Sequence, residues 1–486
     1  MNINSGDGSY LKFLTESEVE TLHVSSLEIL EKTGVIVDNG ELQEELANKG
    51  ARVDEEADIV YLPPGVVEGA LDQAPSGFSV FERGEDETEL LVGGNVVHTH
   101  TTGGPSYIHD RKSGKRRNAL LQDVGEAARV VSHLDNIHAY SPLVSPTDVV
   151  PGTEEVEMIN AAIRNTHKVV ENPVSSGKHV ELLNQIFCAV AGGEEKLKGK
   201  PLFIVSVSPV SPLNFDRGSA GALLEAAKYE LPIKVLPAPS TGATSPVTFA
   251  GALAQQNAEL LAGLTMVQTV SPGLPTTLAP RLSIMDMRTS FVSWGTTELG
   301  AASARAVQLI NSYDLPSDVY GLASDSKVMD QQLGYERAMN GILPATAGAN
   351  FLSGAGGLES LKSCSLSQLV VDNEIFGMIL DTVSGFEISE ETLALDVIDG
   401  VGPGGDFLRE RHTLNHTLEG EQYESALGDR RTWEQWLAAG RKEISQVAEE
   451  EVEKILKDAS PVELEENVEA ELDEVLEEAR SYYKDR

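Results

Sequence analysis

Between about residues 95 and 385, helical segments alternate with short runs of β-branched and apolar residues. The predicted helices cover residues 121–133, 154–165, 178–191, 217–229, 247–269, 296–313, 330–345 and 364–381. The predicted strands lie at 95–101, 137–144, 168–170, 202–207, 233–236, 276–278, 319–322 and 348–352. Strands that alternate with helices in this way form parallel βα units. Eight such units predict an α/β fold of the (β/α)8 type, a TIM barrel, rather than an open doubly wound sheet.

The flanking regions have different patterns. Near the start, Thr15 to Glu18 reads as a capping box for a helix that ends at Gly34. Near the end, Pro461 separates two helices, and the second has an apolar stripe. The stripe consists of Val468, Leu472, Val475 and Leu476. We therefore expect an N-terminal α+β region (1–94), the barrel (95–385) and a C-terminal helical extension (386–486).

The chain is strongly acidic. It contains 76 Asp and Glu against 37 Lys and Arg, a formal net charge of −39 over 486 residues. Such a surface repels phosphate backbones and anionic lipids, which argues against nucleic-acid or membrane-surface binding. Because salt screens self-repulsion, the composition favours a halophilic protein in a salt-rich cytoplasm. No apolar run is long enough to span a membrane, and no secretory leader is apparent, so we expect a cytoplasmic protein.

The sequence gives little support for a cysteine-based, nucleotide-binding or metal site. The two cysteines, Cys188 and Cys364, form no metal-binding or disulfide pattern, although Cys364 remains a minor candidate nucleophile. No GxGxxG motif follows the first predicted strand, and no P-loop or GxSxG motif occurs. His98 and His100 point to one side of a predicted strand and could bind a metal ion. They support an alternative function, that of a metal-dependent barrel hydrolase. No strand end after residue 200 supplies a further histidine ligand, so a hydrogen-bonded structural pair is favoured.

In a parallel barrel, the active site forms at the carboxyl ends of the strands. The segments predicted to lie there are rich in small residues and hydroxyls and poor in titratable groups. They are 208–212, 237–246, 280–288, 324–328 and 353–360. The predicted mouth therefore offers few candidates for a general acid or base.

Several of these segments, and others along the chain, contain sequence motifs that resemble those of a known family. The motifs are the run 240–263, Met285-Asp-Met-Arg288, Asp325 to Gln331, Gly354-Ala-Gly-Gly-Leu-Glu359 with the run 368–374, and Val401 to Leu408. In this order they resemble the trimethylamine methyltransferase superfamily over nearly the whole chain. The resemblance implies a barrel that moves a methyl group from a methylated amine to the cobalt of a separate corrinoid protein.

One position departs from the trimethylamine branch of that superfamily. There, pyrrolysine directly follows the Gly-Ala-Gly-x-Leu-Glu motif, whereas this sequence has Ser360. Members without pyrrolysine resemble methyltransferases for quaternary amines such as glycine betaine. Attack by Co(I) on a quaternary ammonium methyl expels a neutral tertiary amine, so no proton is needed. The protein then contributes a cation site and alignment, and no catalytic acid or base is predicted.

A quaternary ammonium donates no hydrogen bond and is best held by aromatic faces and carboxylates. The predicted aromatic groups are Tyr107, Tyr140, Tyr320 and Phe351, and the predicted counter-charges are Asp286 and Glu359. Either Arg288 or Arg281 could pair with the carboxylate of a betaine. Ser360 is the first choice for lining the pocket.

The resemblance also implies partners. We expect no tightly bound cofactor, a corrinoid (cobalamin) carried by a cognate protein, and a homo-oligomer. Besides the metal-dependent hydrolase, the remaining alternative is a non-catalytic betaine-binding protein that keeps the pocket without a corrinoid partner.

Overall fold

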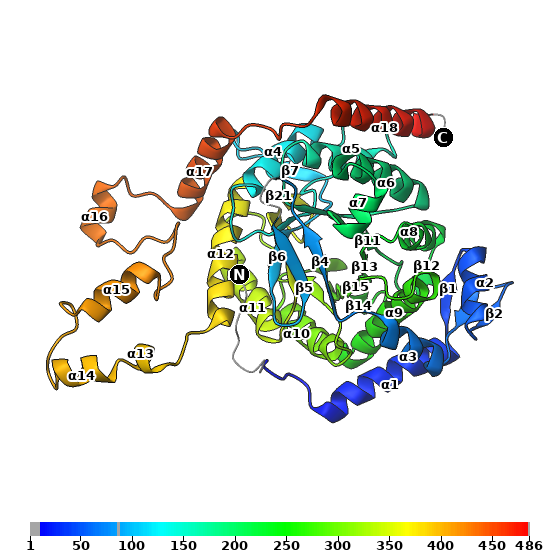
Figure 1. The fold of residues 1–486 in the computed structure, drawn as a ribbon, viewed down its shortest axis with the longest axis horizontal. Helices are drawn as coiled ribbons and strands as arrows, with labels where there is room; N and C mark the ends of the chain where they lie inside the picture. The colour runs from blue at the N-terminus through cyan, green and yellow to red at the C-terminus, as the bar shows by residue number, and fades with distance from the viewer. Residues whose placement is uncertain (1–9, 85–87, 485–486) are drawn as a thin grey trace.

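The computed structural model describes residues 10–84 and 88–484 and contains the expected barrel (Figure 1). Its eight parallel strands are β6 (His98–Thr101), β9 (Ala139–Tyr140), β10 (Val169–Pro173), β11 (Phe203–Val207), β13 (Ile233–Val235), β15 (Thr276–Leu278), β18 (Asp318–Tyr320) and β19 (Phe351–Ala355). Consecutive strands pair from β6 to β15 and from β18 to β19, and β19 pairs with β6. A parallel bridge between Leu278 and Ser317 joins β15 to β18 and closes the ring.

A helix follows each barrel strand. These helices are α4 (Leu121–Val131), α5 (Glu154–Ile163), α6 (Gly177–Ala191), α8 (Arg217–Lys228), α9 (Phe249–Val270), α10 (Thr297–Asn311), α11 (Gln331–Thr346) and α12 (Leu366–Ser384), with the short α7 (Glu194–Gly199) after α6. Side chains cap several of them: Asp216, Asp330 and Ser365 each accept a hydrogen bond from a first-turn backbone N–H. The predicted (β/α)8 fold is confirmed, and its boundaries differ from the prediction by only a few residues.

A hairpin covers the amino end of the barrel. It consists of β4 (Gly77–Phe81) and β5 (Glu89–Gly93). Its apolar residues Phe78, Val80, Leu90 and Val92 form one cluster with Phe351 and other residues at the strand starts. Because this end is plugged, the carboxyl end is left as the open mouth.

The N-terminal region lies against the outside of the barrel. It contains α1 (Glu16–Lys32), β1 (Val35–Val37), α2 (Gly40–Asn48), β2 (Arg52–Asp54), β3 (Ile59–Tyr61) and α3 (Pro64–Gln73). The expected capping box at Thr15 is present. Strand β1 pairs with β12 (Asn214–Phe215), which lies in the loop between β11 and α8 of the barrel, and Leu30 is part of the main core. The division at residue 94 stays a prediction.

Two small sheets rise from the strand ends around the mouth. One contains β14 (Ser240–Thr241), β16 (Ser283–Asp286) and β17 (Phe291–Ser293). The other contains β7 (Tyr107–His109), β8 (Arg116–Asn118), β20 (Gly357–Leu358) and β21 (Ser363–Cys364). Most of the predicted site residues lie on these sheets or on the loops beside them.

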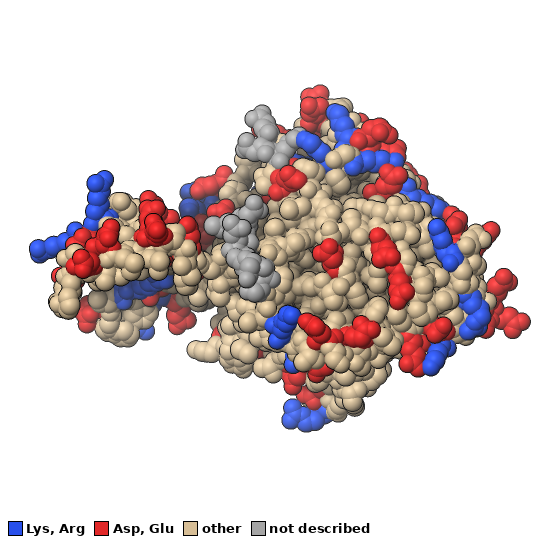
Figure 2. Space-filling model, turned by 60° about the horizontal axis from the view of Figure 1, so that its bottom comes forward, with Lys and Arg blue, Asp and Glu red and all other residues tan. Residues whose placement is uncertain are grey.

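The C-terminal extension has two parts. Helices α17 (Ile444–Asp458) and α18 (Glu466–Lys484) lie on the barrel helices, and Leu472, Val475 and Leu476 of the predicted stripe are buried. Helices α13 (Glu390–Leu393), α14 (Leu395–Val401), α15 (Arg411–Glu419) and α16 (Trp433–Ala438) instead project sideways (Figure 1). In space-filling view they form a separate lobe that carries both acidic and basic side chains (Figure 2). No helix among the described residues has the length and apolar character that crossing a bilayer requires.

Candidate active site

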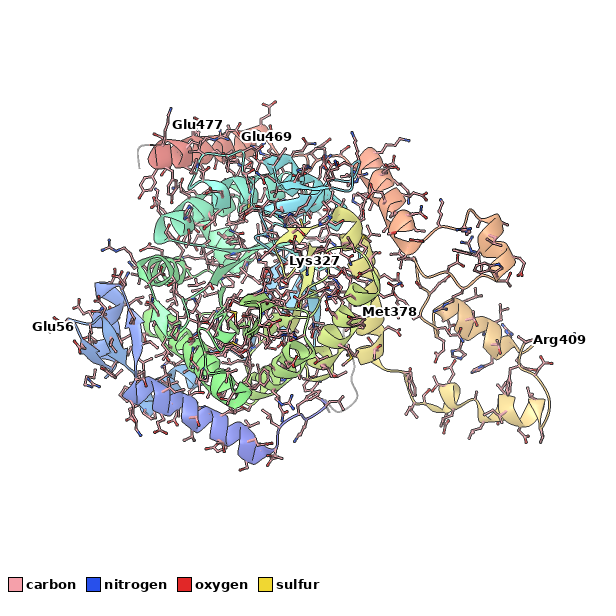
Figure 3. The ribbon with its side chains drawn as sticks, turned by 180° about the vertical axis from the view of Figure 1, so that it is seen from behind. Glu56, Lys327, Met378, Arg409, Glu469 and Glu477 are labelled. Atoms are coloured by element: carbon pink, nitrogen blue, oxygen red, sulfur yellow. The ribbon has the colours of Figure 1, made fainter. Side chains whose placement is uncertain are left out.

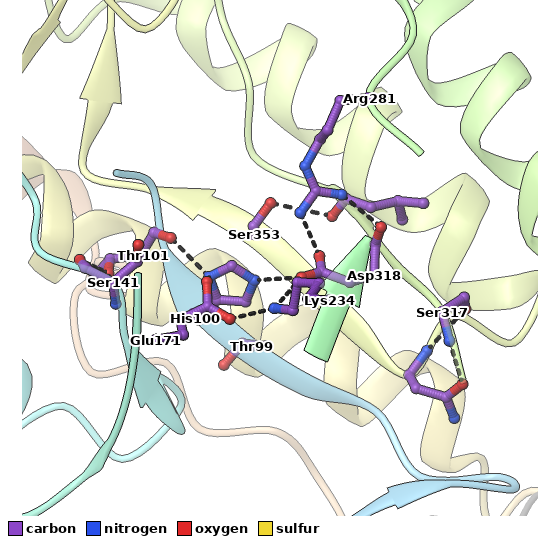
Figure 4. A network of polar contacts seen from close by, with 12 residues as sticks. Thr99, His100, Thr101, Ser141, Glu171, Lys234, Arg281, Ser317, Asp318 and Ser353 are labelled. Carbon is purple, nitrogen blue, oxygen red and sulfur yellow. Dashed lines mark hydrogen bonds and ion pairs between the residues drawn. The ribbon is translucent and has the colours of Figure 1, made fainter. Parts of the chain in front are cut away.

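A network of buried charged side chains fills the centre of the barrel (Figure 4). His100 lies on β6, Glu171 on β10, Lys234 on β13 and Asp318 on β18, and all four side chains are almost fully buried. The Lys234 ammonium forms ion pairs with both carboxylates. His100 Nδ1 lies 2.9 Å from Glu171 Oε1, and its Nε2 lies 3.0 Å from Asp318 Oδ2. Inward-facing side chains from four different strands thus meet at one level of the barrel.

Arg281 extends this network toward the mouth. It lies just after β15, is 3% exposed, and its Nη2 is 2.6 Å from Asp318 Oδ1. Burial alone would lower the pKa of His100, but the carboxylates of Glu171 and Asp318 outweigh burial and raise it. With His100 protonated, three cations face two carboxylates. The network then carries a net positive charge just below the mouth, which favours an anionic group there.

The carboxylates of the network are held ionised. Burial alone would raise the pKa of Glu171, but His100 and Lys234 outweigh it and lower that pKa to about 2. Burial likewise opposes ionisation of Asp318, but Arg281 and Lys234 hold its pKa well below its ordinary value. These groups therefore do not serve as proton donors near neutral pH.

The geometry does not favour a metal site at the two predicted histidines. His98 Nε2 donates to the Leu91 carbonyl oxygen at 2.8 Å, and burial lowers the pKa of His98 to about 4. His100 instead joins Glu171 and Asp318, a trio whose ligand atoms could hold a metal ion. The Lys234 ammonium already contacts both of those carboxylates and supplies the positive charge that an ion would bring. The structural interpretation of His98 and His100 fits this arrangement.

The cysteines are poorly suited to nucleophilic chemistry. Cys364 on β21 is completely buried, and burial raises the pKa of its thiol well above the ordinary value. Cys188 lies on α6, where burial also raises its pKa. A neutral thiol is a weak nucleophile, so neither residue is placed for covalent catalysis.

An aromatic pair lies above Arg281. Tyr320, at the end of β18, packs edge-on against Trp294 with ring centroids 4.8 Å apart. The Arg281 guanidinium lies 4.6 Å from the Tyr320 ring centroid. Both rings are half-buried, so they present aromatic surface next to a cation-rich interior. The structure therefore brings two of the predicted residues, Tyr320 and Arg281, into contact.

Ser360 lies beside this pair and is held by Asp325. Its hydroxyl donates to Asp325 Oδ1 at 2.6 Å. The same carboxylate accepts hydrogen bonds from the Ser293 hydroxyl and from the backbone N–H groups of Trp294 and Gly295. One carboxylate therefore fixes Ser360 and the backbone that carries the Trp294 ring.

The backbone at Ser360 is strained. Glu359, Ser360 and Leu361 have φ values of 56°, 53° and 61°, so three consecutive residues with side chains adopt the left-handed region. Each such residue costs roughly 1–2 kcal/mol. The N–H groups of Glu359 and Ser360 donate to the carbonyls of Ser326 and Ser324, which hold the turn in place. Strain of this kind is concentrated at functional sites.

The glycines before this turn are required by close contacts. Gly354 has a φ of 110°, and a Cβ there would lie 2.9 Å from the Leu322 backbone. The Gly356 N–H donates to Asp372 at 2.6 Å, and Asp372 also pairs with the buried Arg337 at 2.7 Å. Burial raises the pKa of Asp372 to about 6 despite this pairing. Arg337 also contacts the Gly357 carbonyl, so the pair clamps the loop that leads to Ser360.

Two predicted counter-charges already have partners at the rim. Glu359 pairs with Arg116 at 2.6 Å, and the Arg116 guanidinium lies 4.2 Å from the ring centroid of Tyr107. Glu359 and Tyr107 are thus brought together through a residue that was not predicted. Asp286 accepts a hydrogen bond from the backbone N–H of Arg288 and also pairs with the Arg288 side chain, which is 91% exposed. Their roles in binding remain predictions.

Two predicted aromatic residues lie away from the mouth. Phe351 is fully buried at the lower end of the barrel, with its ring centroid 5.7 Å from that of His100 and 4.8 Å from the Lys234 ammonium. Tyr140 is fully buried, and its hydroxyl donates to the Val124 carbonyl of α4 at 2.9 Å. Tyr140 therefore faces the helix layer, whereas Phe351 supports the charged network from below.

Sequence reasoning missed the residues that organise the site. Glu171, Lys234 and Asp318 form the network, and Asp325 and Trp294 organise the mouth. A signal was present, because Lys234 is a single charged residue within the apolar strand Ile233–Val235. A charge at an inward-facing strand position requires a buried partner from another strand.

The fold and the site together define a class: a (β/α)8 barrel whose mouth combines aromatic rings, a buried cationic network and a strained glycine-rich loop. Comparison with known proteins specifies it further. The family model described as trimethylamine methyltransferase (MTTB) matches residues 3–481. The chain is 35% identical over 477 residues to trimethylamine methyltransferase MttB of Desulfitobacterium hafniense, covering 98% of this chain and 96% of that protein.

Two further similarities agree with this match. Glycine betaine methyltransferase of Desulfitobacterium hafniense is 31% identical over 462 residues, covering 94% of this chain and 95% of that protein. The crystal structure of the Methanosarcina barkeri monomethylamine methyltransferase MtmB aligns with a TM-score of 0.53 at 14% identity, covering 98% of this chain and 88% of that one, and supports the fold. The chain belongs to the trimethylamine methyltransferase family and is a methyltransferase.

Proposed function

We propose that this methyltransferase removes a methyl group from a quaternary amine of the betaine class and transfers it to Co(I) of a cognate corrinoid protein. The observation that carries the proposal is Ser360, which stands where the resemblance places pyrrolysine in the trimethylamine branch. A serine hydroxyl held by Asp325 at 2.6 Å offers no electrophile for capturing a tertiary amine. A quaternary amine requires none, because its nitrogen already carries the positive charge that makes it a leaving group.

The charges at the site support a zwitterionic substrate. The net positive network below the mouth suits a carboxylate, and Arg281 is its member nearest the mouth. The Trp294 and Tyr320 rings suit the trimethylammonium end. A betaine with its carboxylate toward Arg281 would point its methyl groups outward, toward an incoming corrinoid. Of the two arginines left open by the sequence, we therefore favour Arg281 over the exposed Arg288.

The reaction is an in-line displacement. The electron pair of Co(I) forms a bond to the methyl carbon while the carbon–nitrogen bond breaks, and its electron pair stays on nitrogen. The products are a methylated cobalt centre and a neutral tertiary amine, so protons balance without an acid or base. Enzyme residues act by orienting the substrate and excluding water, which fits a network whose carboxylates stay ionised.

The setting proposed is a salt-rich cytoplasm, supported by the net charge of −39. A homo-oligomer is also proposed. If the surface is adapted to salt, the midpoint of thermal unfolding rises as NaCl increases from dilute buffer to about 1 M, where the Debye length is about 3 Å. An unfolding midpoint that is already maximal in dilute buffer would contradict this setting.

The substrate class can be tested with a panel of amines. The enzyme is incubated with free Co(I) cobalamin and glycine betaine, other betaines, choline or trimethylamine, and formation of methylcobalamin is followed by absorbance. We expect methyl transfer from at least one betaine and none from trimethylamine. Transfer from trimethylamine but from no quaternary amine would overturn the proposal.

A further inference from the structure

The lateral lobe of the C-terminal extension presents an unusual amount of apolar surface. We call residues 385–443, which include α13 to α16, the arm. None of these four helices contains a buried residue. Eleven large apolar side chains are exposed: Phe386, Ile388, Leu393, Leu395, Ile398, Phe407, Leu408, Leu414, Leu418, Trp433 and Leu437. Exposed helices of four to nine residues are not stable by themselves in water, so the arm needs a partner surface.

The arm nevertheless contacts the body near its base, where Leu427 packs against the main core. Glu374 of α12 accepts hydrogen bonds from the Tyr423 hydroxyl at 3.1 Å and from the Ala426 N–H at 3.0 Å. The arm joins the body at two roots, the end of α12 and the start of α17. Figure 3 shows Arg409 at the far tip of the arm and Met378 on α12, facing the side from which the arm departs. The arm is therefore a shaped projection held at its base.

An apolar groove lies on the body beside these roots. It has a volume of about 840 Å³ and runs between α11, α12 and the start of α17. Its apolar lining includes Met329, Leu333, Ile342, Ile375, Met378 and Ile444. Tyr335 and Met339 of α11 are exposed nearby on the same helix. The chain thus carries an apolar projection and an apolar groove on one flank.

We propose that the arm packs on the α11–α12 groove of a second copy of this chain, while the arm of that copy packs on the groove of the first. A two-fold axis beside the groove places both contacts in one closed, isologous interface, because projection and groove share a flank. Eleven apolar side chains bring on the order of 1,000 Å² into the contact, above the roughly 800 Å² per partner of a standard stable interface. This inference develops the proposed homo-oligomer and is independent of the methyl-transfer reaction.

Charge and position favour a second copy over the methyl acceptor. The arm contains 13 Asp and Glu against 6 Lys and Arg, so it shares the negative sign of the body, and its contact must be apolar rather than electrostatic. A transient partner would leave this surface in water between encounters, whereas a permanent self-contact covers it, and permanent interfaces are the more apolar. The arm also projects from the side of the helix ring, away from Lys327, which lies by the barrel mouth in Figure 3.

The test measures the mass of the full-length protein in solution by light scattering at micromolar concentration. One copy has a mass of 52.1 kDa. We expect the wild type to contain an even number of copies. The arm variant Ile398→Glu/Leu414→Glu and the groove variant Met378→Glu should each shift it to smaller species, because each places a charge in the contact. The control Val24→Glu changes a residue of α1 that is as exposed as Ile398 and should leave the mass unchanged.

Circular dichroism and methyl transfer to free Co(I) cobalamin serve as separate readouts. The substituted positions lie outside the core, so the variants should keep the wild-type helix content and activity. A wild type with the mass of a single copy, or an arm variant that keeps the wild-type mass, would overturn the proposal. An arm variant that retains its mass but loses activity with a corrinoid protein would assign the arm to that partner instead. Failure of the proposed substrate would leave these mass measurements unaffected.

Discussion

Ion pairs occur both in the barrel interior and at the rim of the mouth, but the interior pairs are buried and the rim pair is exposed to solvent. In the interior, Lys234 pairs with two carboxylates that are 5% exposed or less, whereas at the rim Arg288 pairs with Asp286 while its own side chain is 91% exposed. Breaking a buried pair leaves a charge without solvent, while an exposed pair exchanges its partner for water. The interior therefore sets the stability and electrostatic field of the site, whereas the exposed rim pair contributes little to stability.

The largest effect is expected from Lys234→Met. This change leaves Glu171 and Asp318 buried without their shared cation, and it should lower the free energy of unfolding by about 3–5 kcal/mol. Chemical denaturation measures this directly. Lys12→Met removes a lysine from an exposed pair with Glu16 and is the control, for which we expect little change. If the two variants have the same free energy of unfolding, buried and exposed ion pairs contribute equally to stability, which would contradict this prediction.

A second effect concerns substrate binding at Arg281. Arg281→Lys keeps the charge but loses the planar, forked geometry that binds a carboxylate, so KM for glycine betaine should rise about 10- to 100-fold. The KM for choline, which lacks a carboxylate, should change much less. Arg288→Lys is the matched rim variant and should affect neither. Equal losses with betaine and choline would show that Arg281 is structural only.

The third prediction separates orientation from folding at the mouth. In Asp325→Ala, the Ser360 and Ser293 hydroxyls and two backbone N–H groups lose their common acceptor. We expect kcat/KM to fall about 10-fold or more and stability to fall by about 1–3 kcal/mol. Asp325→Asn keeps one acceptor oxygen and should recover part of the activity. An Asp325→Ala enzyme with wild-type kcat/KM would remove Asp325 from the site.

The smallest effect is the pH dependence of stability. The pKa of Glu171 is lowered to about 2 and that of Asp318 lies well below its ordinary value, so their stabilisation is complete above about pH 4.5 and is lost as the pH falls toward 2. The pKa of His100 is raised, so its contribution is complete below about pH 6.5 and is lost as the pH rises through the raised value. Unfolding free energies measured across this range should flatten at the alkaline end in His100→Gln. An unchanged alkaline slope in this variant would contradict the assignment.

The fold was predictable because strand and helix periodicities are local. All eight barrel strands and their helices followed from runs such as Ile233 to Leu236 and from the apolar faces of helices such as α4. The two-part C-terminal helix pattern around Pro461 followed in the same way. The projecting arm was not foreseen, because short helical segments look alike whether they lie on a barrel or extend from it.

The site was only partly predictable. The motif that ends at Ser360 located the mouth, but the partners of Ser360 and Arg281 come from other strands. Asp325 and Asp318 reach them only because the barrel closes. Phe351 and Tyr140 were chosen as aromatic residues near strand ends, and their direction depends on strand register, which a sequence does not specify. Contacts between distant strands thus account for most of what was missed.

In the proposed reaction a methyl group leaves a betaine and reaches cobalt. A single turnover can follow this transfer, with glycine betaine labelled with ¹³C in its N-methyl groups, this enzyme and Co(I) cobalamin. We expect a ¹³C-methyl signal on cobalamin and an equal amount of dimethylglycine, both lost in Arg281→Lys at low substrate concentration. Bound betaine that yields neither product, from wild-type enzyme with either free cobalamin or a corrinoid protein, would contradict it.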